Sequence, residues 1–370
     1  MAKKKKDKKT SLPVKILKGI LALVLVFVIG FFALAGYLTA TEFKPSEYEG
    51  VAVEKAENAE KTVAAGDTLT VLSYNIGYCA NDKDHDFFMD GGKTVNTESR
   101  ENIEKNLSGI INTIKEADAD VNFIQEVDKS SKRSYHVNEY SSISESLEDY
   151  SAAYATNYRV KYVPYPLPTI GEVESGVAIF NKFTANESAL RVGFPTAFSW
   201  PVSLCQLKRC LLVEYVPIEN SDKMLVLVNL HLDAYDDGEG KKLQTQILSD
   251  FLKNEYEKGN YVIAGGDFNQ TFPDVQGEQY EVVNDEYFVP GVVDTSLFPE
   301  GWQIIADDDV PSARLLNEPY NPESENTQYY VLDGFILSPN VKSVSVETLD
   351  CGFENSDHNP VVLTAQLEEE

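Results

Sequence analysis

The chain has 370 residues, of which 43% are hydrophobic and 25% are charged, a globular composition that allows one large domain or two ordinary ones. Its formal net charge is −27, and removing the first 18 residues, with eight lysines and one aspartate, leaves −34. Nucleic-acid binding gains affinity from basic groups that release counterions, so this charge disfavours DNA or RNA as a partner without excluding it. The sequence also has no Walker loop and no GxSxG nucleophile elbow.

Residues 19–41 form an uncharged apolar run that follows a lysine-rich tail over residues 1–18. As a helix this run would measure about 35 Å, against roughly 30 Å for a hydrocarbon core. A cleaved signal peptide is the alternative, since the triplets at 33–35 and 38–40 resemble cleavage sites, but its apolar region is usually only about 7–15 residues. We therefore expect a single-pass transmembrane anchor in the cell membrane. The basic tail places its N-terminus in the cytoplasm and the rest of the chain outside.

An acidic, alanine-rich segment follows at residues 42–67, and we interpret it as a stem that holds the domain off the membrane. From residue 68 to 370 we expect one domain in which buried strands alternate with a few helices, which indicates an α/β protein with sheets as its main layers. The expected strands are 69–76, 120–127, 174–183, 208–218, 223–233, 260–269, 329–339 and 359–367, and the expected helices are 98–117 and 242–259.

The four cysteines are Cys79, Cys205, Cys210 and Cys351. An external location permits disulfides, and four cysteines allow three pairings. Because Cys205 and Cys210 are close in sequence, we expect a local disulfide between them. No CxxC or Cys/His spacing indicates a structural zinc site.

Polar side chains recur where the buried runs end, and each taken alone is typical of a cap or turn. Together they are carboxylates, carboxamides and imidazoles that a rigid scaffold presents to a cleft. Carboxylate and carboxamide oxygens suit Mg²⁺, and a neighbouring histidine serves a phosphate oxygen, so the set predicts a phosphoryl-transfer site. Its members are Asn75, Glu126, His231, Asp233, Asp267, Asn269, Asp333, Asp357 and His358.

The ordered motifs SYNI, FIQEV, NLHLD, GGDFN, LDGFILS and SDHNPV resemble those of the endonuclease/exonuclease/phosphatase superfamily, over residues 69–366. The resemblance implies a four-layer α/β/β/α sandwich of two packed mixed β-sheets, here preceded by one N-terminal transmembrane helix. It also implies a metal-dependent phosphoric ester hydrolase that uses Mg²⁺, with Mn²⁺ or Ca²⁺ as alternatives.

The resemblance assigns roles to individual positions. It implies that Glu126 is the main metal ligand, with Asn75 and Asp357 nearby. Asp267 would orient or deprotonate the attacking water, and Asn269 would hold a phosphate oxygen or that water. His231 and His358 would contact the scissile phosphate, and Asp333 would hydrogen-bond His358 and raise its pKa.

Three cations are candidate phosphate contacts: Arg133, Arg159 and Arg314. Ordinary solvated surface charge explains them equally well. We expect a membrane-anchored, outward-facing phosphoesterase acting on a lipid head group or another small phosphate ester. The alternatives are an extracellular nuclease acting on DNA or RNA and a non-catalytic binding protein on the same fold. No protein partner is inferable.

Overall fold

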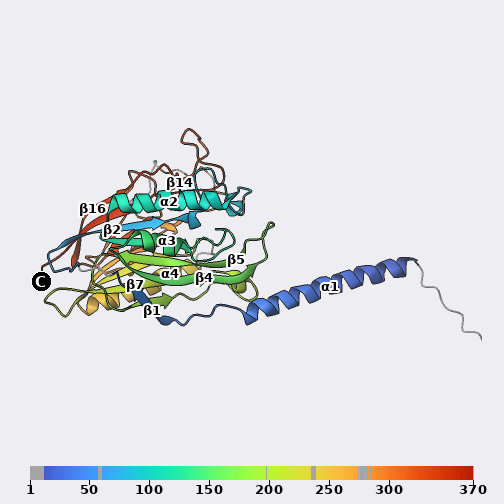
Figure 1. Cartoon of the computed structure of the whole chain (residues 1–370), viewed down its shortest axis with the longest axis horizontal. Helices are drawn as coiled ribbons and strands as arrows, with labels where there is room; N and C mark the ends of the chain where they lie inside the picture. The colour runs from blue at the N-terminus through green and yellow to red at the C-terminus, as the bar shows by residue number, and fades with distance from the viewer. Residues whose placement is uncertain are drawn as a thin grey trace, which may run out of the picture. The chain divides into compact units, whose positions relative to one another are not determined.

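The computed structural model describes residues 12–56, 61–196, 198–234, 239–273, 275, 280, 282–283 and 285–369. The chain divides into two compact units, Met1–Glu42 and Phe43–Glu370. In the first unit, α1 (Leu12–Ala40) is the one helix of the described residues that is long and apolar enough to cross a membrane (Figure 1). It begins seven residues before the predicted run and includes Lys15 and Lys18, whose long side chains tolerate a position near a membrane surface. Such a helix fits a membrane anchor or a signal sequence.

The second unit contains a continuous mixed sheet in the order β12-β15-β9-β8-β7-β6-β1-β4-β5-β3-β2-β17-β16. Its strands are β1 (Tyr48–Glu54), β2 (Thr68–Asn75), β3 (Val121–Asp128), β4 (Ser151–Val163), β5 (Gly171–Asn181), β6 (Ser188–Gly193), β7 (Cys210–Pro217), β8 (Met224–His231), β9 (Tyr261–Asp267), β12 (Gln303–Ile305), β15 (Asp333–Leu337), β16 (Val341–Thr348) and β17 (Val361–Leu367). Two short pairs lie outside it, β10 (Gln270–Thr271) with β11 (Gly291–Val292) and β13 (Ala313–Arg314) with β14 (Tyr329–Tyr330).

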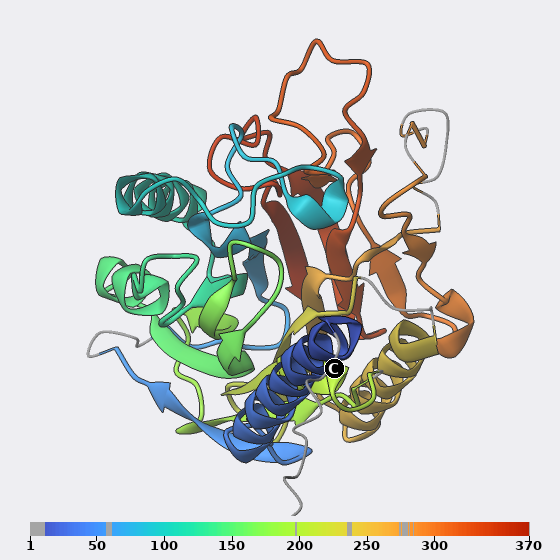
Figure 2. The ribbon, with the colours of Figure 1, turned by 90° about the vertical axis from the view of Figure 1, so that its right-hand side faces the viewer.

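The sheet folds into two packed halves around a central apolar core. That core joins side chains of β2, β3, β5 and β17 to side chains of β7, β8, β9 and β15. A second cluster packs α2 (Arg100–Ala117) and α3 (Glu139–Ser146) on one outer face, and a third packs α4 (Glu239–Glu257) on the other. Figure 2 shows α2 and α3 on one side of the sheets and α4 on the opposite side. The predicted four-layer α/β/β/α class is therefore confirmed.

The predicted stem is wrong over residues 48–54, because these residues form β1 and close the gap between the two halves. Residues 48–52 pair with β6, and Val53 and Glu54 pair with β4. Val51 and Val53 pack against the central core, and Val63 is buried within it. The domain therefore begins at Phe43 rather than at residue 68.

Local sequence explains the helices that cross over between parallel strands. Ser99 caps α2 by accepting a hydrogen bond from the backbone of Asn102, and apolar side chains at helical spacing face the sheet. This helix connects the parallel pair β2 and β3, and α4 connects the parallel pair β8 and β9. Both parallel pairs therefore bring the carboxyl ends of their strands to one edge.

The predicted Cys205–Cys210 disulfide is absent, since all four cysteines are described and free. Cys210 is the first residue of β7, and its side chain is buried in the central core between the two sheet halves. Cys205 ends the short helix η3 (Val202–Cys205), and its carbonyl accepts a hydrogen bond from Tyr158. The core position of Cys210 keeps its thiol away from the loop that carries Cys205.

Candidate active site

The candidate site lies at the edge where the parallel strands end. Asn75 ends β2, His231 ends β8 and Asp267 ends β9. The register places His231 opposite Asp267, and the antiparallel strand β15 places Asp333 on the other side of Asp267. The topology thus brings together residues that are separated by more than 250 positions in the chain.

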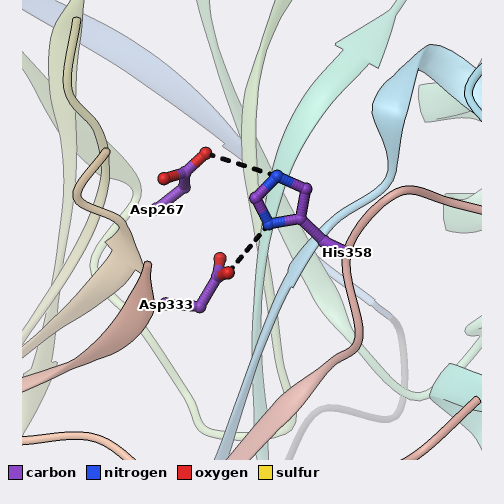
Figure 3. A group of neighbouring side chains, drawn as sticks. All are labelled: Asp267, Asp333 and His358. Carbon is purple, nitrogen blue, oxygen red and sulfur yellow. Dashed lines mark hydrogen bonds and ion pairs between the residues drawn. The ribbon is translucent and has the colours of Figure 1, made fainter. Parts of the chain in front are cut away.

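His358 is held between two aspartates, as Figure 3 shows. Its Nδ1 lies 2.8 Å from Asp333 Oδ2, and its Nε2 lies 3.8 Å from Asp267 Oδ2. Ser312 fixes this arrangement, because its hydroxyl donates to Asp333 Oδ2 at 2.8 Å and accepts from the backbone of Leu332 and Asp333. Burial opposes the charged imidazolium, but the nearby carboxylates, Asp333 first, outweigh it and raise the pKa of His358 well above its ordinary value. At neutral pH this histidine is therefore a buried cation.

Asp267 is the centre of the cluster and is 1% exposed. Its Oδ2 accepts a hydrogen bond from Asn75 Nδ2 at 3.0 Å and lies 3.3 Å from His231 Nε2. Its Oδ1 accepts from the backbone N–H of Asn269 at 2.8 Å. Asn269 adopts a positive φ of 48°, and its side-chain amide donates to the Leu232 carbonyl. These contacts fix the orientation of the Asp267 carboxylate.

His231 differs from His358 in charge. It is buried, and burial together with the positive charges of Arg209 and His358 holds its pKa well below the ordinary value. Its Nδ1 has no hydrogen-bond partner within the described part of the chain. His231 is therefore a neutral imidazole whose Nε2 faces Asp267 and whose other nitrogen is unsatisfied.

Glu126 also approaches His231, with its Oε1 3.9 Å from the same nitrogen, His231 Nε2, that faces Asp267. Its φ of 59° is unusual for a residue with a side chain, and it falls where the β3–β5 register shifts. Burial raises its pKa to about 7, and the charge of Asp357 adds to this effect. Glu126 is thus held in a strained backbone conformation, out of water and beside a second carboxylate. Because a cation would offset the repulsion between the two carboxylates, this arrangement favours a bound cation.

These residues fit a divalent metal ion. Glu126, Asp357 and Asn75 supply hard oxygen donors. Among the residues described, Asp357 accepts only long contacts from side chains, at 3.4 Å each, from Asn81 and Ser356. Metal-ligand spacing also occurs in Asp267, Asp333 and His358, whose ligand atoms lie within 4.8 Å of one another. In that group, however, Asp333 Oδ2 and His358 Nδ1 already bond each other, and only Asp333 Oδ1 has no partner among the described residues, so we favour the Glu126 side for the metal.

Sequence reasoning missed Arg209. It lies just before β7, and its Nε donates to Asp233 Oδ1 at 3.2 Å. Gln244 holds Asp233 through two hydrogen bonds of 2.7 and 3.0 Å. The Nη1 of Arg209 is buried and has no partner among the described residues, while its charge acts on both His231 and Glu126. Asp233 in the motif NLHLD was the signal that could have indicated Arg209. A carboxylate at the end of a strand that carries candidate site residues needs a cation nearby.

The three predicted arginines each have partners within the domain. Arg133 pairs with Asp128 through two hydrogen bonds of 2.9 and 3.2 Å and stacks on Tyr78. The guanidinium of Arg159 lies over the ring of Phe43. Arg314 is 4% exposed and donates to backbone carbonyls, including that of Asp82. We therefore favour Arg209 over Arg159 and Arg314 as a phosphate contact, while Arg133, whose charge acts on Glu126, stays a candidate.

The four-layer sandwich and a cluster of carboxylates and histidines at its strand ends define a class of phosphoester hydrolases. The family profile described as the endonuclease/exonuclease/phosphatase family matches residues 72–358, and the chain belongs to that family. The predicted resemblance is therefore confirmed. Members of this family are hydrolases that act on phosphoester bonds and are generally dependent on divalent metals.

Solved structures share the fold. The endonuclease/exonuclease/phosphatase from Beutenbergia cavernae DSM 12333 is 17% identical, with a TM-score of 0.57, over 81% of this chain and 72% of that chain. The family protein from Bacteroides thetaiotaomicron is 14% identical, with a TM-score of 0.51, over 82% of this chain and 100% of that chain. The one from Bacteroides vulgatus is 17% identical, with a TM-score of 0.50, over the same shares. No curated protein matches the sequence.

Proposed function

We propose that this protein is a membrane-anchored, outward-facing, Mg²⁺-dependent phosphoesterase. It hydrolyses a phosphodiester or phosphomonoester by in-line attack of water, on a lipid head group or another small phosphate ester rather than on DNA. The observation that carries the proposal is the convergence on Asp267. Asn75, His231 and His358, from three separate strand ends or loops, all lie within 3.8 Å of one of its carboxylate oxygens.

In this proposal Asp267 orients the attacking water and accepts its proton. Asn75 fixes the Asp267 carboxylate, and the Asn75 Oδ1, which already accepts from the Gly77 backbone N–H at 3.1 Å, keeps a second lone pair for a ligand. Glu126 and Asp357 would hold the Mg²⁺. When bound, this ion neutralises the charge that develops on the phosphate oxygens.

The phosphate is held on the opposite side by nitrogen donors. Charged His358 donates from Nε2, because its Nδ1 is committed to Asp333. Neutral His231 donates from Nε2, and Arg209 offers its unsatisfied Nη1. Asn269 lies beside Asp267 and would hold a phosphate oxygen or the water. Buried, preoriented donors of this kind stabilise charge more strongly than water does.

Two features support a small or lipid substrate. The chain after residue 18 carries a formal charge of −34, which repels polyanions at long range. The helix α1 would keep the domain at a membrane surface, with the basic tail in the cytoplasm. To test the anchor, protease is added to intact cells, where it should degrade the domain of a full-length, membrane-bound protein. Recovery of a soluble form starting near residue 36 or 41 would instead identify a cleaved signal sequence.

The activity is tested with bis-p-nitrophenyl phosphate, with Mg²⁺ and with a chelator. Wild-type protein should hydrolyse it only with metal, and Asp267→Asn should be inactive. Asp250→Asn is the matched control, since its side chain is 55% exposed on α4. Absence of hydrolysis by wild type with Mg²⁺, Mn²⁺ and Ca²⁺ would indicate a binding protein. A panel of sphingomyelin, inositol phosphates, plasmid DNA and abasic DNA then tests the substrate class, and faster cleavage of DNA would overturn our preference.

A further inference from the structure

Two loops of the domain expose large apolar side chains. The tip of the β4–β5 hairpin exposes Tyr165 and Leu167, which are 72% and 83% accessible. The loop before β7 exposes Trp200 and Val202, each 53% accessible. We call these four residues the apolar rim. Figure 1 shows the β4–β5 hairpin extending beyond its neighbouring strands at one end of the domain.

Direct contacts tie the loop before β7 to β4, the strand that leads to the hairpin tip, and the same loop leads into the site. The loop before β7 is tied to β4, because Tyr158 donates to the Cys205 carbonyl and the backbone of Lys208 donates to that of Asn157. That loop continues directly into Arg209, whose charge reaches His231. At the hairpin tip, the ring of Tyr165 contacts that of Phe88 edge-on, with centroids 6.3 Å apart.

The rim also differs from the rest of the domain in charge. The residues after position 18 carry a formal charge of −34, yet the segments 156–170 and 198–209 contain no aspartate or glutamate. Both segments carry cations, among them Arg159 and Lys208. An acid-free apolar surface with tyrosine and tryptophan matches the composition that favours the membrane–water interface.

The chain joins the domain at the base of these same loops. Phe43 lies under the guanidinium of Arg159, 4.4 Å from ring centroid to Cζ. Arg191 connects the joining segment to β4 and to the loop before β7, since it donates to the carbonyls of Ser46, Thr156 and Lys208. Only residues 41 and 42 separate Ala40, the last residue of α1, from Phe43, a chain length of roughly 10 Å.

We propose that the apolar rim inserts into the interface of the bilayer that α1 spans, so that the candidate site opens toward the lipid surface. This inference rests on the membrane anchor of the proposed function and adds a second attachment to it. A short tether keeps the rim beside the bilayer, where its exposed apolar side chains leave water by entering the lipid. The occupant is a zwitterionic lipid surface, because the acidic domain would be repelled by an anionic one.

Tryptophan fluorescence tests the rim directly, because the chain has two tryptophans, Trp200 and Trp302. Full-length protein is reconstituted in phosphatidylcholine vesicles with and without brominated acyl chains, and flotation confirms that it is anchored. Trp302→Phe leaves Trp200 as the probe, and brominated lipid should remove most of its emission. Trp200→Phe leaves Trp302, which packs between Tyr256 and Phe298, and its emission should be unaffected. Equal Trp200 emission in both vesicles would overturn the proposal.

The test does not depend on correct folding of Trp302→Phe. The emission of the wild-type protein minus that of Trp200→Phe gives the emission of Trp200 alone. A matched pair of substitutions is then compared by this difference. Leu167→Asp should weaken quenching of Trp200, whereas Val344→Asp, at an exposed apolar residue on the edge strand β16, should leave it unchanged. Equal quenching in both variants would also contradict the rim. The inactive Asp267→Asn protein should still be quenched, so failure of the rim and failure of the catalytic proposal are distinguishable.

Discussion

Glu214 is a buried acid that the proposed mechanism does not use, and its titration has a predictable effect on stability. It lies on β7, is 0% exposed, and accepts a hydrogen bond from Asn181 Nδ2. Its other oxygen has no partner among the residues described. Burial raises its pKa to about 8 from an ordinary value of 4.5, although the hydrogen bond from Asn181 opposes this. Glu214 is therefore protonated in the folded domain at neutral pH and ionised in the unfolded chain.

The direction in which pH changes the stability follows from this difference in proton binding. Because the folded state holds the proton more tightly, stability is greatest below pH 4.5 and is lost as the pH rises toward 8. The slope is about 1.4 kcal/mol per pH unit, which amounts to about 3–4 kcal/mol between pH 5 and pH 8. Glu214→Gln keeps the shape, stays neutral and removes this dependence.

Thermal unfolding of the full-length protein in nonionic detergent measures the effect. The variant should melt close to wild type at pH 5 and about 5 °C higher at pH 8, a shift expected for a domain of this size. Glu219→Gln is the control, since Glu219 is exposed just after β7, and it should leave the pH dependence of wild type unchanged. An equal difference between Glu214→Gln and wild type at both pH values would refute the reasoning.

Three further predictions concern the site and the cysteines. Glu126→Ala should recover part of its rate on bis-p-nitrophenyl phosphate at high Mg²⁺, whereas Asp267→Asn should stay roughly 10²–10⁴-fold slow at every metal concentration; identical metal dependence would contradict the separate roles. His358→Ala should lose a similar factor, Asp333→Asn should lose less, and the double variant should match His358→Ala alone because the pair acts as a unit; additive losses would contradict that coupling. All four cysteines should carry the alkylating label after denaturation without reductant; mass spectrometry finding a disulfide-linked peptide would overturn the free thiols.

The sequence predicted the elements whose signal is local. Continuous apolar runs marked the central strands, and the polar residues that end them lie together as expected. It missed β1 because this strand is acidic and only partly buried, and its partners β6 and β4 lie about 100 or more positions away. The distant partners of Arg314 were missed for a similar reason. Two of the carbonyls that it contacts belong to Asp82 and His85, in a loop that no local pattern connects to it.

The position of β1 also bears on which substrates the site can meet. This strand pairs with both β4 and β6, so the joining segment is fixed to the two strands that lead into the loops of the apolar rim. If α1 spans a bilayer, as proposed, a tether of roughly 10 Å would not allow the domain to move far from it. Long-range repulsion by the acidic surface acts on polyanions in solution, but a zwitterionic head group already beside the acid-free rim does not have to cross that field. Charge and tether therefore favour the same class of substrate: a phosphate ester presented at the membrane surface.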